Sequence, residues 1–172
     1  MMARSHFAGG LFAAAIANAA GWLPAVPALV ILTPFMALLP DVDTPVSTIG
    51  ARVKIISVPL SMTTRHRGMT HSILAAALVF ALAAYGLAPV LADVGVPVAF
   101  PVGLGLAMSL SYGSHMLLDM ISGGAEALWP VMGRIGIKAV ATGGVADYAI
   151  AIVLGGSASW YWWTVMGMRG FG

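Results

Sequence analysis

The chain has 172 residues, of which 60% are hydrophobic and 8% are charged. A soluble domain carries about 25% charged residues, so this composition leaves too little polar surface for a water-soluble globule. It indicates an all-α integral membrane protein with a single domain over residues 1–172. The chain has no cysteine, which excludes disulfides and thiolate metal ligands. Its net charge of +2 does not point to a nucleic-acid partner.

Five apolar segments predict a bundle of about four to five transmembrane helices. They cover residues 6–23, 27–39, 70–87, 98–121 and 146–168. The first two are short, since a helix of about 13–17 residues spans only ~20–26 Å of the ~30 Å hydrocarbon core, and we expect them to form a tilted or partly embedded hairpin. A polar loop covers residues 41–70, a turn covers residues 88–97, and a glycine-rich loop covers residues 122–145.

The ionisable residues gather at the segment ends on one side. If the helices alternate in direction across the membrane, all four histidines and most carboxylates share one membrane face. Seven basic residues share it too, and Arg169 lies opposite; the seven are Arg4, Arg52, Lys54, Arg65, Arg67, Arg134 and Lys138. By the positive-inside rule this face is cytoplasmic. We therefore expect a multi-pass protein of the inner cell membrane with its N-terminus inside.

Two short motifs offer metal ligands. His115 and Asp119 are four residues apart, so on a helix they share one face and can reach the same ion; a hydrogen-bonded structural pair is the alternative. Asp41 and Asp43 follow Pro40, which ends a helix and turns the chain. Two carboxylates on a turn are typical oxygen ligands, although aspartate is also common in a plain polar turn.

The polar loop ends with His66 and His71, and a glycine between them permits the turn that lets both side chains converge. Thr70 is expected to cap the helix that follows. Arg65 and Arg67 flank His66 and are expected to hold a phosphate group through charge-assisted hydrogen bonds. Anchoring at the membrane surface is the alternative role for these arginines.

Three further residues are open candidates. A lone histidine at a helix start is more often solvated, but His6 belongs to the same face as the other histidines. Asp147 suits a ligand, a charge favoured by the helix dipole, or a partner for a cation. Glu126, in the glycine-rich loop, is either an acid–base group or a solvated side chain.

Together these residues resemble the YdjM-type membrane-bound metal-dependent hydrolases. The resemblance rests on Leu39-Pro40-Asp41-Val42-Asp43, on His66-Arg67-Gly68-Met69-Thr70-His71-Ser72, on Ser114-His115-Met116-Leu117-Leu118-Asp119 and on Leu128-Trp129-Pro130. His6 with Gly10 resembles the family's N-terminal H-x-x-x-G. That family is remotely similar to the zinc-dependent phospholipase C and single-strand nuclease fold, in which an H-x-x-x-D helix supplies a histidine and a bridging aspartate to clustered zinc ions. The resemblance implies these roles for His115 and Asp119, and a phosphoester as substrate.

The function that we predict is therefore a membrane-bound metal-dependent hydrolase that acts on a lipid-derived or nucleotide-like phosphoester at the membrane surface. The cofactor is expected to be one or two divalent ions, zinc first and Mn²⁺ or Fe²⁺ as alternatives. The predicted ligands are His6, Asp41, Asp43, His66, His71, His115 and Asp119. Water bound to the metal would supply the nucleophile, with Asp43 or Asp119 orienting it or acting as base. Arg65 and Arg67 would stabilise the developing charge.

Membrane lipids, a phosphorylated substrate and a homo-oligomer or larger membrane complex are the expected partners. The alternative is a non-enzymatic membrane protein, either a small ion or proton transporter or a subunit whose metal site is structural. A transporter usually places its polar groups near the bilayer midplane. Here most of them lie at segment ends, which favours a site at the membrane surface.

Overall fold

The computed structural model describes residues 1–63, 66–98 and 100–169. In this part the chain is all-helical, as predicted, apart from two isolated β-bridges that join Ser122 to Lys138 and Ala125 to Ile135. The elements are α1 (Ala3–Ala19), α2 (Pro27–Phe35), η1 (Met36–Asp43), α3 (Lys54–Thr63), η2 (Met69–His71), α4 (Ile73–Ala81), η3 (Leu82–Leu87), α5 (Ala88–Asp93), α6 (Pro101–Ile121) and α7 (Val145–Arg169).

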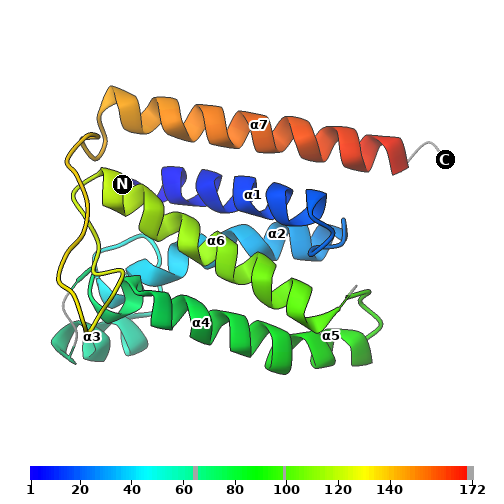
Figure 1. Ribbon diagram of the computed structural model, residues 1–172, viewed down its shortest axis with the longest axis horizontal. Coiled ribbons are helices and arrows are strands. Elements are labelled where there is room, and N and C mark those ends of the chain that lie inside the picture. The colour runs from blue at the N-terminus through cyan, green and yellow to red at the C-terminus, as the bar shows by residue number, and fades with distance from the viewer. Residues whose placement is uncertain (64–65, 99, 170–172) are drawn as a thin grey trace.

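Helix α1 lies at the centre of the bundle. It packs against α6 on one side and α7 on the other, while α4 runs along the far side of α6 (Figure 1). The N-terminus, α3, the end of α6, the glycine-rich loop and the start of α7 all gather at one end of the molecule (Figure 1). This is the end at which the alternation of segments predicted the histidines and carboxylates.

Small residues allow α1 to approach its neighbours closely. Ala14, Ala15 and Ala17 are buried in the core, where they cluster with larger side chains such as Leu104 of α6 and Trp162 of α7. Interfaces between helices in membrane proteins use small residues in this way because the backbones can then come into contact. Close packing through these small side chains thus fixes the position of α1, and therefore the positions of the polar groups at its start.

Gly10 is the position where this close packing is tightest, and Gly10→Ala is expected to destabilise the fold by about 1–3 kcal/mol. A Cβ atom there would lie 2.7 Å from the Cβ of Ala37 and 2.7 Å from the carbonyl oxygen of Pro34. Helix α1 would have to move away from η1, which carries Asp41. Unfolding of the purified protein in mixed micelles measures the effect.

Gly113→Ala is the matched control on α6. A Cβ atom at Gly113 has no neighbour within 4 Å, and alanine is the better helix former. We expect this variant to be as stable as the parent or slightly more stable. Equal stability of the Gly10→Ala and Gly113→Ala proteins would contradict the packing argument.

The third apolar segment departs from the prediction. The predicted turn over residues 88–97 is wrong for its first part, because α4, η3 and α5 form a single helix over Ile73–Asp93. Pro89 lacks the amide hydrogen that a helix interior needs. The π-helical turn η3 directly before it accommodates the missing hydrogen bond. The polar loop over residues 41–70 likewise contains a helix, α3, that was not expected.

Ile73–Asp93 is the one helix in the described part of the chain that is long and apolar enough to cross a membrane by length and composition. The other helices share the same bundle but do not meet both measures. A bundle of four to five membrane spans therefore stays a prediction.

Candidate metal centre

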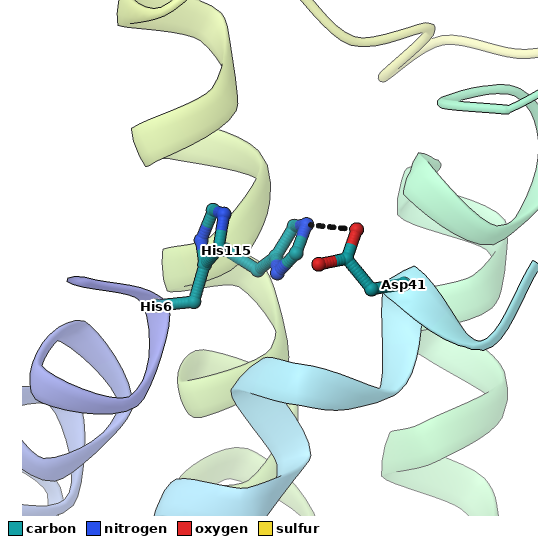
Figure 2. Close-up of side chains that lie close together, drawn as sticks. All are labelled: His6, Asp41 and His115. Carbon is teal, nitrogen blue, oxygen red and sulfur yellow. Dashed lines mark ion pairs between the residues drawn. The ribbon is translucent and has the colours of Figure 1, made fainter. Parts of the chain in front are cut away.

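Four helices and one loop bring the seven predicted ligands together at one end of the bundle. The ligands are His6 of α1, Asp41 and Asp43 of η1, His66 of the loop before η2, His71 of η2, and His115 and Asp119 of α6. Figure 2 shows His6, Asp41 and His115 approaching one another from three of these elements. Residues as far apart as 6 and 119 in the sequence thus share one site.

The ligand atoms form three overlapping groups, each within 4.8 Å. The groups are His6 with Asp41 and His115, then His71 with His115 and Asp119, then Asp41 with Asp43 and His66. Because Asp41 and His115 each belong to two groups, the donors form one continuous cluster. Imidazole and carboxylate donors of this kind suit zinc, manganese or ferrous iron.

The central donors lie about as far apart as the ligands of a single metal ion. Nε2 of His71 and Nε2 of His115 lie 3.0 Å apart. Oδ2 of Asp119 lies 3.5 and 3.4 Å from these two nitrogens, and Oδ1 of Asp41 lies 3.7 and 3.6 Å from them. Four ligands at about 2.0–2.1 Å from a zinc ion lie about 3.3–3.4 Å from one another. His71, His115 and Asp119 therefore have separations close to those of three ligands of one tetrahedral ion, and Asp41 approaches the same two nitrogens.

His115 is held in the orientation that a ligand needs. Its Nδ1 lies 2.7 Å from the carbonyl oxygen of Ala37, so Nδ1 carries the proton and donates it there. Nε2 is then left with its lone pair facing the cluster. Metal-binding histidines commonly donate their second N–H to a carbonyl or carboxylate in this way, which fixes both tautomer and ring orientation.

His6 joins the cluster from the opposite side. Its ring stacks on that of His115 with centroids 3.6 Å apart, and its Nε2 lies 3.4 Å from Oδ1 of Asp119. Its Nδ1 is buried and has no hydrogen-bond partner among the described residues. A buried nitrogen without a partner costs free energy. The donor set therefore has room for a further ligand or ion beside His6.

Asp119 is the most heavily paired carboxylate of the cluster. Its Oδ1 accepts hydrogen bonds from the amino group of Met1 at 2.8 Å and from Nη2 of Arg67 at 3.0 Å. Its Oδ2 faces the histidines. A buried carboxylate is stable only when cations or hydrogen-bond donors surround it. Asp119 thus connects the centre of the cluster to positive groups at its edge.

Asp43 anchors the histidine loop. Its Oδ1 lies 3.0 Å from Nδ1 of His66, and its Oδ2 accepts hydrogen bonds from Oγ1 of Thr70 at 2.7 Å and from the backbone N–H of Arg67 at 3.2 Å. Tyr112 in turn donates its hydroxyl hydrogen to the carbonyl of Thr70. With these donors around it, Asp43 is buried, and its role in the structure is to orient the loop.

The predicted cap at Thr70 was wrong. The cap of α4 is Ser72, whose Oγ accepts the N–H of Ala75 at 3.2 Å. Thr70 points instead toward Asp43 and also lies 3.1 Å from Nδ1 of His71. Thr70 and Ser72 both carry a hydroxyl near the start of α4. Because Thr70 donates its hydroxyl hydrogen to Asp43, Ser72 is the residue that caps the helix.

The carboxylates shift the proton affinity of His71. Burial alone would lower the pKa of His71, but hydrogen bonds to Asp119, Asp41 and Asp43 outweigh burial and raise it to about 10. Burial alone would raise the pKa of Asp43, yet hydrogen bonds from His66, His71 and Thr70 hold it well below its ordinary value. A metal ion at Nε2 of His71 would take the place of this proton, so its binding releases protons.

Arg67 is turned inward. Its φ of 65° is in the left-handed region, which non-glycine residues rarely adopt. Hydrogen bonds hold it there: its carbonyl accepts the N–H of Glu126 at 2.9 Å, and Nη1 reaches the carbonyl of Gly124 at 3.3 Å. With Nη2 on Asp119, the guanidinium is engaged inside the protein. The other predicted arginine, Arg65, lies outside the described residues.

Comparison with known proteins identifies the family of this chain. The model of the YdjM inner membrane protein family matches residues 1–169. The chain belongs to the YdjM inner membrane protein family. It is 40% identical over 114 residues to the inner membrane protein YdjM of Escherichia coli (strain K12), and the same holds for that of Shigella flexneri. The match covers 66% of this chain and 53% of each relative, so the chain spans about half the length of these YdjM proteins. No solved structure matches.

Of the three open candidates, His6 belongs to the cluster, whereas Asp147 and Glu126 fall outside it. Asp147 accepts hydrogen bonds from the backbone N–H of Gly143 at 2.7 Å and of Met2 at 3.2 Å, and from the hydroxyl of Ser5. It ties the start of α7 to the start of α1. Glu126 lines a separate pocket with Trp129. Neither side chain belongs to the three groups of metal-ligand atoms.

Tyr112 and Arg4 lie near the cluster but were not predicted to belong to it. Tyr112 stands on α6 one turn before His115, where a tyrosine reads as ordinary packing, and Arg4 reads as one of several basic residues near a membrane. The spacing of Tyr112 and His115 on one helix face was the available signal. For Arg4 the signal was its place two residues before His6.

Proposed function

We propose that this YdjM-family protein is a metal-dependent hydrolase that cleaves a phosphoester at the surface of the inner membrane. The observation that carries the proposal is the spacing of His71, His115 and Asp119, which fits three corners of one tetrahedral ion, with Asp41 beside the same two histidine nitrogens. When bound there, a divalent ion would lower the pKa of a coordinated water toward ~7 and offset negative charge on a phosphoryl group. The donors present suit zinc, with Mn²⁺ or Fe²⁺ as alternatives.

The remaining residues supply orientation and a path for protons. His115 keeps its Nε2 free because Nδ1 donates to Ala37. Asp43 holds the loop that carries His66 and His71. The side chain of His66 is 48% exposed, whereas the other histidines are buried, and histidine exchanges protons near neutral pH. We assign to His66 the transfer of a proton between the site and solvent during hydrolysis.

An apolar groove beside the cluster favours a lipid-derived substrate over a soluble one. The groove has a volume of about 430 Å³, and Leu60, Leu78 and Leu82 are among its lining residues. Thr70 and Tyr112, which belong to the network around Asp43, also line this groove. A phospholipid would place an acyl chain along such a surface and its phosphate at the polar end.

We further propose that the site faces the cytoplasm and that α1, α6 and α7 cross the membrane beside Ile73–Asp93. Arg4, Arg52, Lys54 and Arg67 lie in or next to the elements that carry the ligands. An excess of arginine and lysine marks the cytoplasmic face of membrane proteins. The partners that follow from this arrangement are membrane lipids and a phosphorylated substrate. Measurement of the molecular mass of the purified protein tests whether it also forms a homo-oligomer.

Hydrolysis by the purified full chain tests the proposal. The protein in detergent, loaded with zinc, is expected to release phosphate from phosphatidic acid in mixed micelles. Chelation should abolish the release, and added Zn²⁺ or Mn²⁺ should restore it, because the protein donors alone supply no activated water. Elemental analysis gives the metal content in parallel. Full zinc occupancy with no hydrolysis of phosphomonoesters or phosphodiesters would overturn the enzyme assignment and favour a structural or transport site.

A further inference from the structure

A polar pocket opens next to Asp41. It has a volume of about 340 Å³ and is lined by Arg4, Asp41, Ser47 and Thr48 together with the first residues of the chain. The side chain of Asp41 is 20% exposed, unlike the buried His71, His115 and Asp119. Asp41 therefore faces the central donors with one oxygen while also bordering this pocket. The pocket adjoins the metal centre through Asp41 and through Met1, whose amino group donates to Asp119.

Arg4 of α1 is one of the residues that line this pocket. Its guanidinium lies over the ring of Tyr148, with Cζ 3.4 Å from the ring centroid. Its Nε and Nη2 are buried and have no hydrogen-bond partner among the described residues. These two atoms form one edge of the guanidinium, the edge that binds two oxygens of a carboxylate or phosphate side by side. Buried donors without partners require an explanation, and an anionic ligand provides one.

The groups around the pocket favour binding of an anion when a cation occupies the metal centre. The first turn of α1 borders the pocket, and the N-terminal end of a helix carries partial positive charge. The hydroxyl of Ser47 is already used, since it donates to the carbonyl of Asp41 at 2.6 Å and accepts the N–H of Gly50 at 2.9 Å. The carboxylate of Asp41 repels an anion unless a cation held with His71 and His115 offsets its charge.

We propose that this pocket is the subsite for the phosphoryl oxygens of the substrate, with Arg4 as the residue that binds them. The inference rests on the proposed function, because it places the substrate of that same metal centre. It assigns to Arg4 the role predicted for Arg67, whose guanidinium is occupied by Asp119 and Gly124. The ligand class is a phosphate monoester or diester, bound through the Nε–Nη2 edge.

Binding of inorganic phosphate to the zinc-loaded full chain, measured by isothermal titration calorimetry, tests the subsite without requiring turnover. Arg4→Gln is expected to weaken phosphate binding by about 10–100-fold, the range for loss of charge-assisted hydrogen bonds. Arg4→Lys should restore only part of the affinity because an ammonium cannot bind two oxygens side by side. The zinc content of both variants should equal that of the parent. Arg134→Gln, which removes an exposed arginine of the glycine-rich loop, is the control and should not change the affinity.

A second pair of variants covers the case in which Arg4→Gln fails to fold. Tyr148 is 49% exposed, so its replacement is tolerated; Tyr148→Leu removes the ring beneath Arg4, and Tyr148→Phe keeps it. Weaker phosphate binding in the leucine variant alone supports the subsite. Unchanged phosphate affinity in a folded, zinc-loaded Arg4→Gln protein overturns it. If the parent binds phosphate through Arg4 but hydrolyses no phosphoester, the proposed function is wrong and the subsite is still supported.

Discussion

Replacing His115 with alanine is expected to lower zinc affinity by more than about 100-fold and to abolish hydrolysis, since even the loss of a group that only orients a ligand costs about 10–100-fold. His115 is one of the two donors that belong to two of the three groups of ligand atoms, and its Nε2 lies within 3.0–3.6 Å of donors on η1, η2 and α6. Its removal also leaves the carbonyl of Ala37 without its donor. No other described side chain occupies that corner of the tetrahedron.

Ser114→Ala is the matched control for this variant. The hydroxyl of Ser114 donates to the carbonyl of Ser111, within the same helix, at 2.6 Å. We expect the control to keep its zinc and its activity. Zinc content by elemental analysis and phosphate release are measured on both proteins, with circular dichroism to verify that the helices remain. Retained zinc in a folded His115→Ala protein would rule out the tetrahedral site.

Asp119→Asn is expected to abolish zinc binding and also to destabilise the metal-free fold by about 3 kcal/mol or more, the cost of leaving buried charges without their partner. The carboxylate faces the amino group of Met1, Nη2 of Arg67 and the histidines at 2.8–3.5 Å. An amide removes the negative charge that balances them. The stability of the metal-free protein therefore distinguishes the two variants, because His115→Ala loses the metal but keeps the carboxylate of Asp119 with its cations.

A double-mutant cycle tests whether the Arg67–Asp119 charge pair causes the expected loss of stability in Asp119→Asn. Arg67→Met removes the cation at the edge of the cluster, and the Arg67→Met/Asp119→Asn protein lacks both partners. If the charge pair accounts for the instability, the double variant is more stable than the sum of the single effects predicts. Denaturant titration of the metal-free proteins in mixed micelles supplies the four free energies. Strictly additive effects would show that Asp119 acts through another contact.

The gathering of the histidines followed from simple topology. Alternating apolar segments place the starts of odd segments and the ends of even ones together, and the structure has His6, Asp41, His71 and His115 at one end. The i, i+4 spacing of His115 and Asp119 needed only the helical period. These features depend on local periodicity and on the direction of the chain, both of which are legible in a sequence.

Other features depended on contacts that a sequence does not display. Arg67 was expected to face a substrate, but its left-handed backbone turns the guanidinium toward Asp119, 52 residues away in the chain. The helix that continues through Pro89 depends on a π-helical turn whose residues, Leu82–Leu87, carry no distinguishing composition. In both cases the outcome is decided by which partner lies nearby, and proximity is a property of the whole fold.

The spread of the donors along the chain imposes an order on the protein's biogenesis. His6 leaves the ribosome early, whereas His115 and Asp119 follow more than 100 residues later, near the end of α6. Synthesis proceeds from the N-terminus, so the tetrahedral site stays incomplete until α6 has been made and has taken its place beside α1. The proposed metal could therefore bind at His71, His115 and Asp119 only after α6 has been synthesised and has packed beside α1.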